Sequence, residues 1–382
     1  MKICAVVAEF NPFHNGHAYL LEKIRSSGYS HIVVVMSGNY VQRGEAAIFS
    51  KDARAKAALQ MGANLVIELP TVKVLATAEK YAFSALSVIK KLGNQINALA
   101  FGTETENFEN LVEIKEILGT ELFKKEVKLQ LEKGLSFAVC RENAVRNISK
   151  SPYIANEIKK PNNILAVEYL KAMDKLGMSL DCLPVKRMEV PGKYFSASKL
   201  REMIIQENLD FKNYIPEKLD FNTNLKASYF EMGREIICKL RSLEKSDFAR
   251  LPDVSEGLEN RIYSAVKKAC SLPELLEIAK TKRYAMARIK RIILCAFLGI
   301  DSNMASAEIP YIRVIGSDEK GFEILKNVNF PVVTRYSDVL KLGSDAQKFF
   351  ELENKFTNIY YSLTKEILPC EKEKTFKMIR ND

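Results

Sequence analysis

Two of the three histidines in this 382-residue chain lie in one short segment, Phe13-His14-Asn15-Gly16-His17. An apolar run over residues 3–8 precedes it, and a helical pattern over residues 18–26 follows it. The first turn of a helix offers unpaired N–H groups and a partial positive charge, so it attracts anions. Imidazoles placed there can donate hydrogen bonds to a phosphate as charge develops on it. The segment therefore predicts a phosphate-handling site with His14 and His17 as its catalytic residues.

The same histidines have two other interpretations. They could simply cap the helix or pack in its turn, as polar side chains at a helix start commonly do. They could also bind a metal, but His31 is the one other histidine and no carboxylate cluster accompanies it, so we predict no metal site.

A second phosphate-binding element is predicted at Ser196-Ala197-Ser198-Lys199-Leu200-Arg201, where Ser198 can N-cap a helix over residues 199–205. The hydroxyls of Ser196 and Ser198 and the Arg201 guanidinium could hold the outer phosphates of a nucleoside triphosphate. The alternative is an ordinary helix cap. Lys186-Arg187 follows a predicted strand over residues 180–184. The pair either adds positive charge to the phosphate site or is a solvated strand end.

Two more segments carry candidate chemistry. The polar segment from Ser37 to Glu45 follows the second predicted strand, so it either holds a second substrate or is an ordinary loop. The stretch from Lys280 to Arg291 is strongly basic, and Tyr284, Arg288 and Arg291 share one helical face in it. That face suits RNA phosphates and base stacking, or it is a solvated basic face. The predicted RNA-binding residues are Lys282, Arg283, Tyr284, Arg288 and Arg291.

Alternating elements must position these residues. Strand-like runs at 3–8, 32–36, 65–69 and 98–101 alternate with helical patterns at 18–26, 52–61 and 78–92. This order predicts an α/β fold with a Rossmann-like parallel sheet. Ligands bind such sheets at the carboxyl ends of the strands, where the histidine segment and Gly102 fall.

The alternation stops near residue 210. Helical patterns follow at 227–243, 258–270, 272–280 and 284–298, then strand-like runs at 309–315 and 330–334 and a helical tail after Ser344. We therefore predict a catalytic domain over residues 1–208 and a mainly helical C-terminal domain over residues 209–382, which carries the basic stretch and is the candidate for binding RNA.

Composition narrows the class of protein. The net charge of +10 favours an anionic partner such as a nucleotide or a nucleic acid, although many surface lysines would give the same balance. The seven cysteines are scattered without a Cys-x-x-Cys pair, as in a reduced cytosolic protein. No apolar run approaches the ~20 residues that span a bilayer, and the N-terminus does not read as a signal sequence. We expect a cytoplasmic protein without a membrane segment.

These motifs resemble known families. His14-x-Gly16-His17 together with Ser196-x-Ser198-x-x-Arg201 resembles the nucleotidyltransferase superfamily. The longer segments resemble the bacterial tRNA(Met) cytidine acetate ligase family, and they are Val7 to His17, Ser37 to Gly44, Phe101 to Glu104, Pro161 to Leu165 and Thr281 to Tyr284.

The resemblance implies a specific reaction. ATP activates acetate to acetyl-adenylate with release of pyrophosphate, and the acetyl group then passes to N4 of the wobble cytidine of elongator tRNA(Met). The implied ligands are ATP, with Mg²⁺ on its phosphates, acetate and the tRNA, with no obligate protein partner. The implied ATP contacts are Val7, Ala8, Glu9, Phe10, Asn11, Pro12, Phe13, His14, Asn15, Gly16, His17, Leu20, Gly102, Asn162 and Arg187. Asn163 is the alternative to Asn162.

Two rival functions remain open. One is a small-molecule adenylyltransferase of coenzyme biosynthesis, which would not need a basic helical domain of this size. The other is a non-catalytic RNA-binding protein with a nucleotide-sensing site, which would not need both histidines and a second phosphate-binding helix. For acetyl transfer, no residue in the sequence stands out as the general base.

Overall fold

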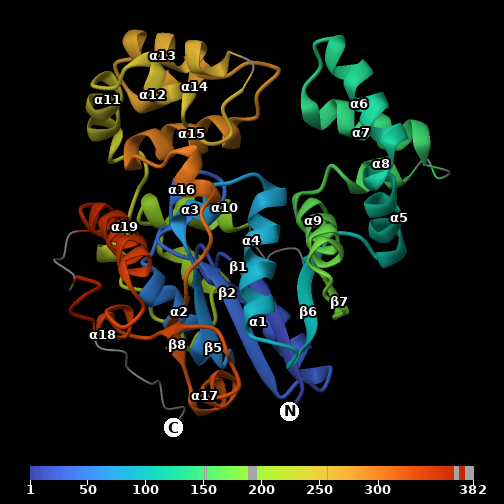
Figure 1. Cartoon of the computed structure of the whole chain (residues 1–382), viewed down its shortest axis with the longest axis vertical. Helices are drawn as coiled ribbons and strands as arrows, with labels where there is room; N and C mark the ends of the chain where they lie inside the picture. Colours follow the sequence, from blue (N-terminus) through green and yellow to red (C-terminus); the bar gives the residue numbers. More distant parts are fainter. Residues whose placement is uncertain (150, 152, 188–195, 256, 365–369, 375–382) are drawn as a thin grey trace.

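A mostly parallel sheet lies at the centre of the molecule (Figure 1). The computed structural model describes residues 1–149, 151, 153–187, 196–255, 257–364 and 370–374, and within them the sheet has seven strands in the order β7-β6-β1-β2-β5-β8-β9. The strands are β1 Ile3–Ala8, β2 His31–Ser37, β5 Leu65–Leu69, β6 Ile96–Thr103, β7 Asp181–Lys186, β8 Ile312–Ser317 and β9 Val332–Val333. The predicted Rossmann-like sheet is confirmed.

Alternate residues of the central strands enter separate cores on the two faces of the sheet. Ile3 and Val33 pack on one face with α4 (Ala78–Lys91) and α9 (Pro161–Leu176). Cys4 and Val34 pack on the other with α1 (Asn15–Ser26), α2 (Lys51–Gln60) and α10 (Ala197–Ile205). The central strands are therefore apolar on both faces, which is why each reads as an unbroken apolar run in the sequence.

Strands β8 and β9 come from the half of the chain that we predicted to be mainly helical. β8 pairs antiparallel with β5, and β9 pairs parallel with β8, so both extend the sheet of the N-terminal half. The apolar runs at 309–315 and 330–334 were recognisable as strands, but local sequence does not say which strand they pair with. The division at residue 208 stays a proposal. It can separate only the helices of the two halves, because β8 and β9 follow residue 208 but belong to the sheet of the N-terminal half.

Two helical groups project from the sheet, and both lie in the upper part of the view in Figure 1. The first group comes between β6 and β7 in the chain, although those two strands are neighbours in the sheet. It contains α5 Phe108–Gly119, α6 Glu121–Glu132, α7 Phe137–Ile148 and α8 Ile154–Glu157. The second contains α11 Gly233–Arg241, α12 Lys245–Ala249, α13 Leu258–Lys268, α14 Leu272–Ala279 and α15 Met286–Leu298. The second group has its own apolar core, which also includes residues of α19 (Ser344–Tyr361).

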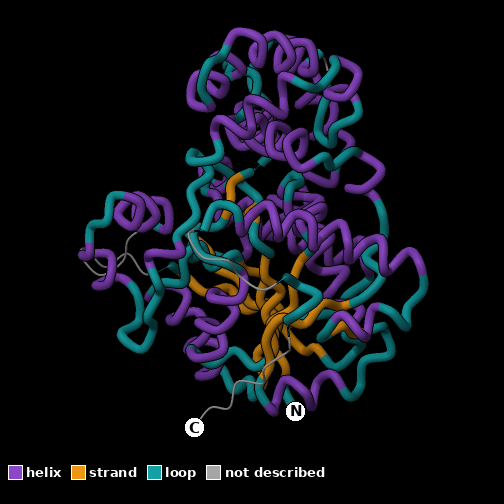
Figure 2. The backbone as a smooth tube through the Cα atoms, turned by 90° about the vertical axis from the view of Figure 1, so that its left-hand side faces the viewer, coloured by secondary structure: helices purple, strands orange, loops and turns teal. Residues whose placement is uncertain are grey.

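Short elements complete the connections. They are the hairpin β3 Tyr40–Val41 and β4 Glu45–Ala46, the 3-10 helices Leu209–Tyr214 and Thr223–Leu225, and the helices α3 Thr71–Val74, α16 Ser302–Ser306, α17 Glu319–Leu325 and α18 Tyr336–Val339. Figure 2 shows the strands enclosed by helices from a second direction. Among the described residues, no helix has the length and apolarity needed to cross a bilayer.

Candidate active site

The two histidines of the first loop cap α1 together. His14 Nδ1 accepts a hydrogen bond from the Gly16 backbone N–H at 3.0 Å, and His17 Nδ1 accepts one from the His14 backbone N–H at 3.2 Å. Since both Nδ1 lone pairs are occupied, each neutral ring carries its proton on Nε2. The rings stack with their centroids 3.7 Å apart. The helix-capping interpretation is confirmed, and capping fixes both imidazoles as Nε2–H donors.

Burial keeps both imidazoles neutral. Burial, together with the nearby Arg187 charge, lowers the pKa of His14 to about 4. The pKa of His17 is also lowered well below its usual value, first by burial and then by His14 and Arg187. The pair thus brings two hydrogen-bond donors to the site near neutral pH without adding positive charge.

The histidines line a cavity of about 540 Å³ at the carboxyl ends of β1, β6 and β7. Most of the predicted nucleotide contacts line it too: Val7, Ala8, Glu9, Phe10, Asn11, His14, Gly16, His17, Leu20, Gly102, Asn162, Arg187, Ser196 and Ser198. A cavity of this size falls in the range of small-molecule sites. The topology therefore brings together motifs that lie up to about 190 residues apart in the chain.

Three of the predicted ATP contacts, Pro12, Phe13 and Asn15, are not among the residues that line the cavity. Phe13 is fully buried and packs against the Phe10 ring with centroids 4.7 Å apart. Asn15 Nδ2 donates to the backbone oxygen of Asn213 at 3.4 Å. These residues support the loop, and within residues 12–17 the cavity is lined by His14, Gly16 and His17.

The helix after residue 195 begins earlier than predicted. Ser196, not Ser198, is the N-cap of α10, because its Oγ accepts the Lys199 backbone N–H at 3.3 Å. Ser198 Oγ instead accepts from the Arg201 guanidinium at 3.2 Å. Arg201 also donates to the Asn11 backbone oxygen at 2.9 Å, so it ties this helix start to the histidine loop.

The two adjacent asparagines at the start of α9 have separate roles. Asn162 lines the cavity and donates to Glu104 Oε1 at 2.6 Å. Asn163 is fully buried, and its Oδ1 accepts the Glu104 backbone N–H at 2.8 Å. The choice of Asn162 over Asn163 as the ATP contact is therefore consistent with the geometry, and it stays a prediction.

The hairpin segment predicted to hold a second substrate reaches the cavity through Val41, Gln42 and Arg43. The Gln42 backbone N–H donates to Glu9 Oε1 at 2.7 Å. Gly44 lies against α15, where a Cβ would stand 2.4 Å from the Arg291 backbone nitrogen. The second helical group thus packs directly against the hairpin that carries Arg43.

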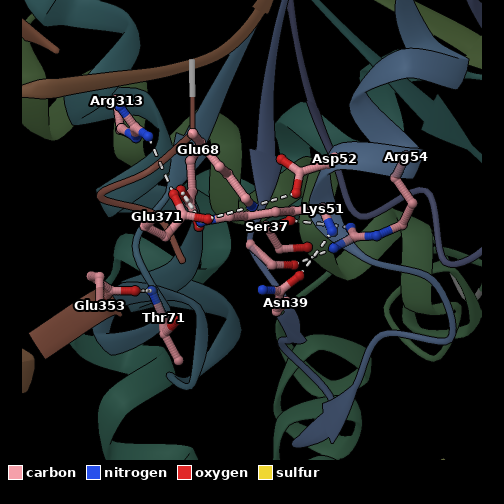
Figure 3. A network of polar contacts seen from close by, with 12 residues as sticks. Ser37, Asn39, Lys51, Asp52, Arg54, Glu68, Thr71, Arg313, Glu353 and Glu371 are labelled. Atoms are coloured by element: carbon pink, nitrogen blue, oxygen red, sulfur yellow. Dashed lines mark hydrogen bonds and ion pairs between the residues drawn. The ribbon is translucent and has the colours of Figure 1, made fainter. Parts of the chain in front are cut away.

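A buried arginine that sequence reasoning missed holds these loops in place. Arg54 of α2 is fully buried and donates to the backbone oxygens of Glu9 at 2.6 Å, Ser37 at 3.1 Å and Phe49 at 2.9 Å, and also to that of Gly38. Figure 3 shows it beside Ser37 and Asn39. A helical pattern gives no sign that one of its cations points inward, because the acceptors are backbone oxygens without a sequence signature.

Next to Arg54, Lys51 is also buried and lies between the carboxylates of Glu68, at 2.7 Å, and Glu371, at 3.4 Å. Arg313 of β8 pairs with Glu371 at 3.2 Å (Figure 3). This network joins α2 to β5, β8 and residues near the C-terminus. It fixes the helix from which Arg54 holds the site loops.

In this conformation Tyr284, Arg288 and Arg291 contact other parts of the protein, so their predicted role in RNA binding stays a prediction. Tyr284 and Arg291 are buried, and Arg291 pairs with the Asp253 carboxylate at 2.9 Å. Arg288 donates to the Asp253 backbone oxygen at 2.9 Å and to Ser255 Oγ at 2.9 Å. These side chains hold a neighbouring segment rather than facing solvent. Lys282 and Arg283 are exposed, and their role in RNA binding stays a prediction.

The cavity lining includes two carboxylates, Glu9 and Glu104. Among the described residues, no group of three or more His, Cys, Asp and Glu side chains could hold a metal ion. Arg43, Arg187 and Arg201 also line the cavity, and these cations together with the two imidazole donors suit an anionic ligand.

Comparisons with known proteins agree with this geometry. The model of the HIGH Nucleotidyl Transferase family matches residues 1–375. A tRNA(Met) cytidine acetate ligase of Thermoanaerobacter sp. (strain X514) is 36% identical over 387 residues, covering 94% of this chain and 95% of that protein. One of Clostridium kluyveri is 35% identical, covering 93% of this chain and 96% of that protein. The crystal structure of Thermotoga maritima TmcAL bound with alpha-thio ATP superposes with a TM-score of 0.91 at 30% identity, covering 100% of both chains.

Proposed function

This chain belongs to the HIGH nucleotidyl transferase family and, within it, to the tRNA(Met) cytidine acetate ligases, and we propose that its cavity performs a two-step ligase reaction. In the first step, acetate attacks the α-phosphate of ATP to give acetyl-adenylate and pyrophosphate. In the second, the acetyl group passes to N4 of the wobble cytidine of elongator tRNA(Met), and AMP leaves. We place this reaction in the cytoplasm.

The observation that carries the proposal is the paired capping of α1 by His14 and His17. It leaves two neutral Nε2–H groups at a helix N-terminus, on the wall of a cavity of nucleotide size. Negative charge builds up on the α-phosphate oxygens as acetate attacks. Donors that are already oriented toward that position stabilise the charge without having to reorganise.

Other groups supply the positive potential that two anionic substrates need. Arg187 lines the cavity from the end of β7, and Arg201 lines it from the start of α10. Ser196 and Ser198 place hydroxyls at the same helix start. We propose that these groups hold the phosphates of ATP and align acetate for in-line attack, so that positioning supplies much of the rate.

We propose that Mg²⁺ enters with the phosphates of ATP rather than occupying a protein site of its own. Glu9 and Glu104 already accept hydrogen bonds, from the Gln42 backbone and the Asn162 side chain respectively. Mg²⁺ commonly keeps several waters and binds through substrate phosphates with few protein ligands. When bound, it would neutralise phosphate charge.

For the second substrate, we propose that tRNA docks across the helical group that packs on the β3–β4 hairpin, with Lys282 and Arg283 among its phosphate contacts. The packing of Gly44 against α15 joins that group to the wall of the cavity. A surface held rigidly to the hairpin could bring a splayed-out cytidine to the same cavity that holds the adenylate.

The test is acetate-dependent exchange of labelled pyrophosphate into ATP, followed by detection of N4-acetylcytidine in tRNA(Met). We expect exchange only with acetate present, and His17→Ala should slow it by ~10²–10³, as for loss of one oxyanion donor. His31→Ala is the matched control, because His31 is buried away from the cavity beside Ser30 and Glu323.

The outcomes separate the rival functions. Exchange that is indifferent to acetate but requires another small anion would indicate a coenzyme adenylyltransferase. ATP binding without any exchange would indicate a nucleotide sensor. Unchanged exchange in the His17→Ala variant would remove the histidines from the adenylation step.

A further inference from the structure

The acetyl transfer step needs a group that takes a proton from cytidine N4. This amine is a weak nucleophile, because its lone pair is delocalised into the ring. We propose that the carboxylate of Glu9 accepts the N4 proton as N4 attacks the acetyl carbon of acetyl-adenylate. The inference rests on the proposed function and deepens it, because it assigns the base for the second step.

Glu9 is held at the edge of the sheet where the parallel strands have their carboxyl ends and the cavity lies. It follows the last residue of β1, and Arg54 holds its backbone oxygen at 2.6 Å. Its Oε1 accepts the Gln42 backbone N–H at 2.7 Å, which connects it to the hairpin that packs on the helical group. Among the described residues, no hydrogen bond or ion pair occupies its Oε2, and the side chain lines the cavity. One carboxylate oxygen is thus held by the Gln42 N–H, and the side chain lies on the wall of the ligand space.

The other titratable groups on the cavity wall are poorer candidates. His14 and His17 have no free lone pair, because both Nδ1 atoms accept backbone N–H groups and Nε2 is protonated. Burial raises the pKa of Tyr81 and of Tyr169, so both hydroxyls stay protonated near neutral pH.

Glu104 is the other carboxylate on the wall. Its Oε1 accepts from Asn162 Nδ2 at 2.6 Å, and it follows Gly102 and Thr103 at the end of β6. Both carboxylates lie among expected ATP contacts, Glu104 beside Gly102 and Asn162, and Glu9 within the segment from Val7 to His17. Of the two carboxylates, Glu9 is the one joined to the hairpin and the helical group beyond it.

The electrostatics of Glu9 suit a base. Burial raises its pKa, while the Gln42 N–H and the charges of Arg43, Arg201 and Arg54 lower it. A carboxylate with a raised pKa binds a proton more strongly than an exposed one. The three guanidinium groups limit that rise, which favours the ionised form that must receive the proton.

The step balances without a further reagent. The N4 lone pair forms a bond to the acetyl carbon, and one N4 proton moves to Glu9. The bond between the acetyl carbon and the phosphate oxygen breaks, and AMP leaves with that electron pair. Glu9 returns its proton to water when the products leave.

The test supplies synthetic acetyl-adenylate and tRNA(Met), so that transfer is measured apart from adenylation. Glu9→Gln is nearly isosteric and its amide oxygen can still accept the Gln42 N–H. We expect a single-turnover transfer rate lower by ~10²–10⁴, the usual contribution of a general base. The loss in transfer should exceed the loss in pyrophosphate exchange by ~30-fold or more. Equal losses in the two steps, or no loss in transfer, would overturn the assignment.

Glu104→Gln is the matched control, since it also removes a carboxylate from the wall of the cavity. We expect it to weaken nucleotide binding and to lower exchange and transfer by similar factors. If Glu104→Gln, and not Glu9→Gln, selectively slowed transfer, Glu104 would be the base and the assignment would fail.

The pH dependence of wild-type transfer tests the inference without any variant. The rate should fall on the acid side as one group protonates, and Glu9→Gln should lose that dependence. The groups around Glu9 are Arg43 on the hairpin, Arg54 on α2, Arg201 on α10, and Tyr81 and Tyr169 on α4 and α9. None of these changes charge between pH 5 and 7, so an acid limb that persisted in the variant, or that the wild type lacked, would overturn the assignment.

The proposed function and the role of Glu9 would be refuted by different results. A wild type without acetate-dependent exchange would refute the proposed function. A wild type that performs both steps, with a Glu9→Gln variant that transfers acetyl at the same rate, would refute only the role of Glu9.

Discussion

The nucleotide cavity and the basic stretch before and within α15 differ in what their polar side chains contact. At the cavity, His14 and Arg187 lie at the ends of strands and line an open space. At α15, Arg288 and Arg291 turn toward Asp253 and bind it. Both regions were predicted to bind phosphates, but the polar side chains of the first line a cavity, whereas the arginines on α15 bind a neighbouring segment.

The difference comes from what determines exposure in each region. Parallel strands end at a common edge, so side chains just beyond them converge wherever the sheet forms. A helix face has no such guarantee, because a segment distant in sequence can cover it. Asp253 lies 38 residues before Arg291, and periodicity within α15 carries no information about it. Cationic spacing on a helix therefore predicts a charged face but not a solvent-exposed one.

Arg54 tests whether the cavity also depends on inward-facing cations. Arg54→Met would leave the backbone oxygens of Glu9, Ser37 and Phe49 without their buried donor. We expect a loss of about 3–5 kcal/mol in the free energy of unfolding, as for breaking a buried charged network. Chemical denaturation measures it, with Arg54→Lys as control. Lysine keeps the charge but cannot reach all the acceptors, so we expect an intermediate loss of stability for Arg54→Lys. A loss under ~1 kcal/mol in Arg54→Met would show that the loops keep their conformation without Arg54.

The pH dependence of stability tests whether the His14 imidazole is buried in the cavity wall. Its pKa is lowered from 6.5 to about 4 by burial and by Arg187. As the pH falls through 6.5, the unfolded chain binds a proton on His14 and the folded chain does not, so the protein loses stability between pH 6.5 and 4. The loss from this residue is at most ~3 kcal/mol.

The matched variant is His14→Asn, because asparagine can still cap α1. Its free energy of unfolding should depend less on pH than that of the wild type between pH 4 and 6.5, and the two slopes should agree above pH 7.5. Identical slopes in the acid window would mean that burial in the cavity wall does not lower the pKa of His14, and the wall would lack the buried neutral donor that the proposed function needs.

Arg291 tests the opposite region. Arg291→Met removes one of two arginines that pair with the partly exposed Asp253 carboxylate, and Arg288 remains at 3.4 Å. We expect a loss of about 2 kcal/mol in the free energy of unfolding, less than for a fully buried pair because solvent reaches Asp253. Affinity for tRNA, measured with folded protein, should not change. A lower affinity with full stability would restore Arg291 as an RNA contact.

The same contrast explains how much the sequence could predict. The bounds of β1 and β5 follow exactly from apolar runs, because both faces of these strands are buried. The histidine motif marked the cavity because its chemistry is local to one loop. The pairing of β8 with β5, the partner of Arg291 and the acceptors of Arg54 all depend on segments far away in the chain. Those contacts could not be predicted from local pattern.

Lys282 and Arg283 provide the smallest and most specific test. Both are exposed in the loop before α15, so their charges remain accessible to phosphates even though the face behind them is covered. The double variant Lys282→Ala/Arg283→Ala should weaken tRNA(Met) binding by ~3–10-fold and lower the salt dependence of the affinity by up to about two phosphate contacts. Filter binding over a range of salt concentrations measures both quantities.

Pyrophosphate exchange should be unaffected in this variant, because neither residue lines the cavity. Lys267→Ala/Lys268→Ala, at the end of α13, is a matched control of equal charge change on the same helical group. An equal loss of affinity in both variants would indicate a diffuse electrostatic surface, since counterion release depends on charge rather than on position. A loss confined to positions 282 and 283 would place the tRNA backbone at the loop that leads into α15, the helix that packs on the hairpin carrying Arg43.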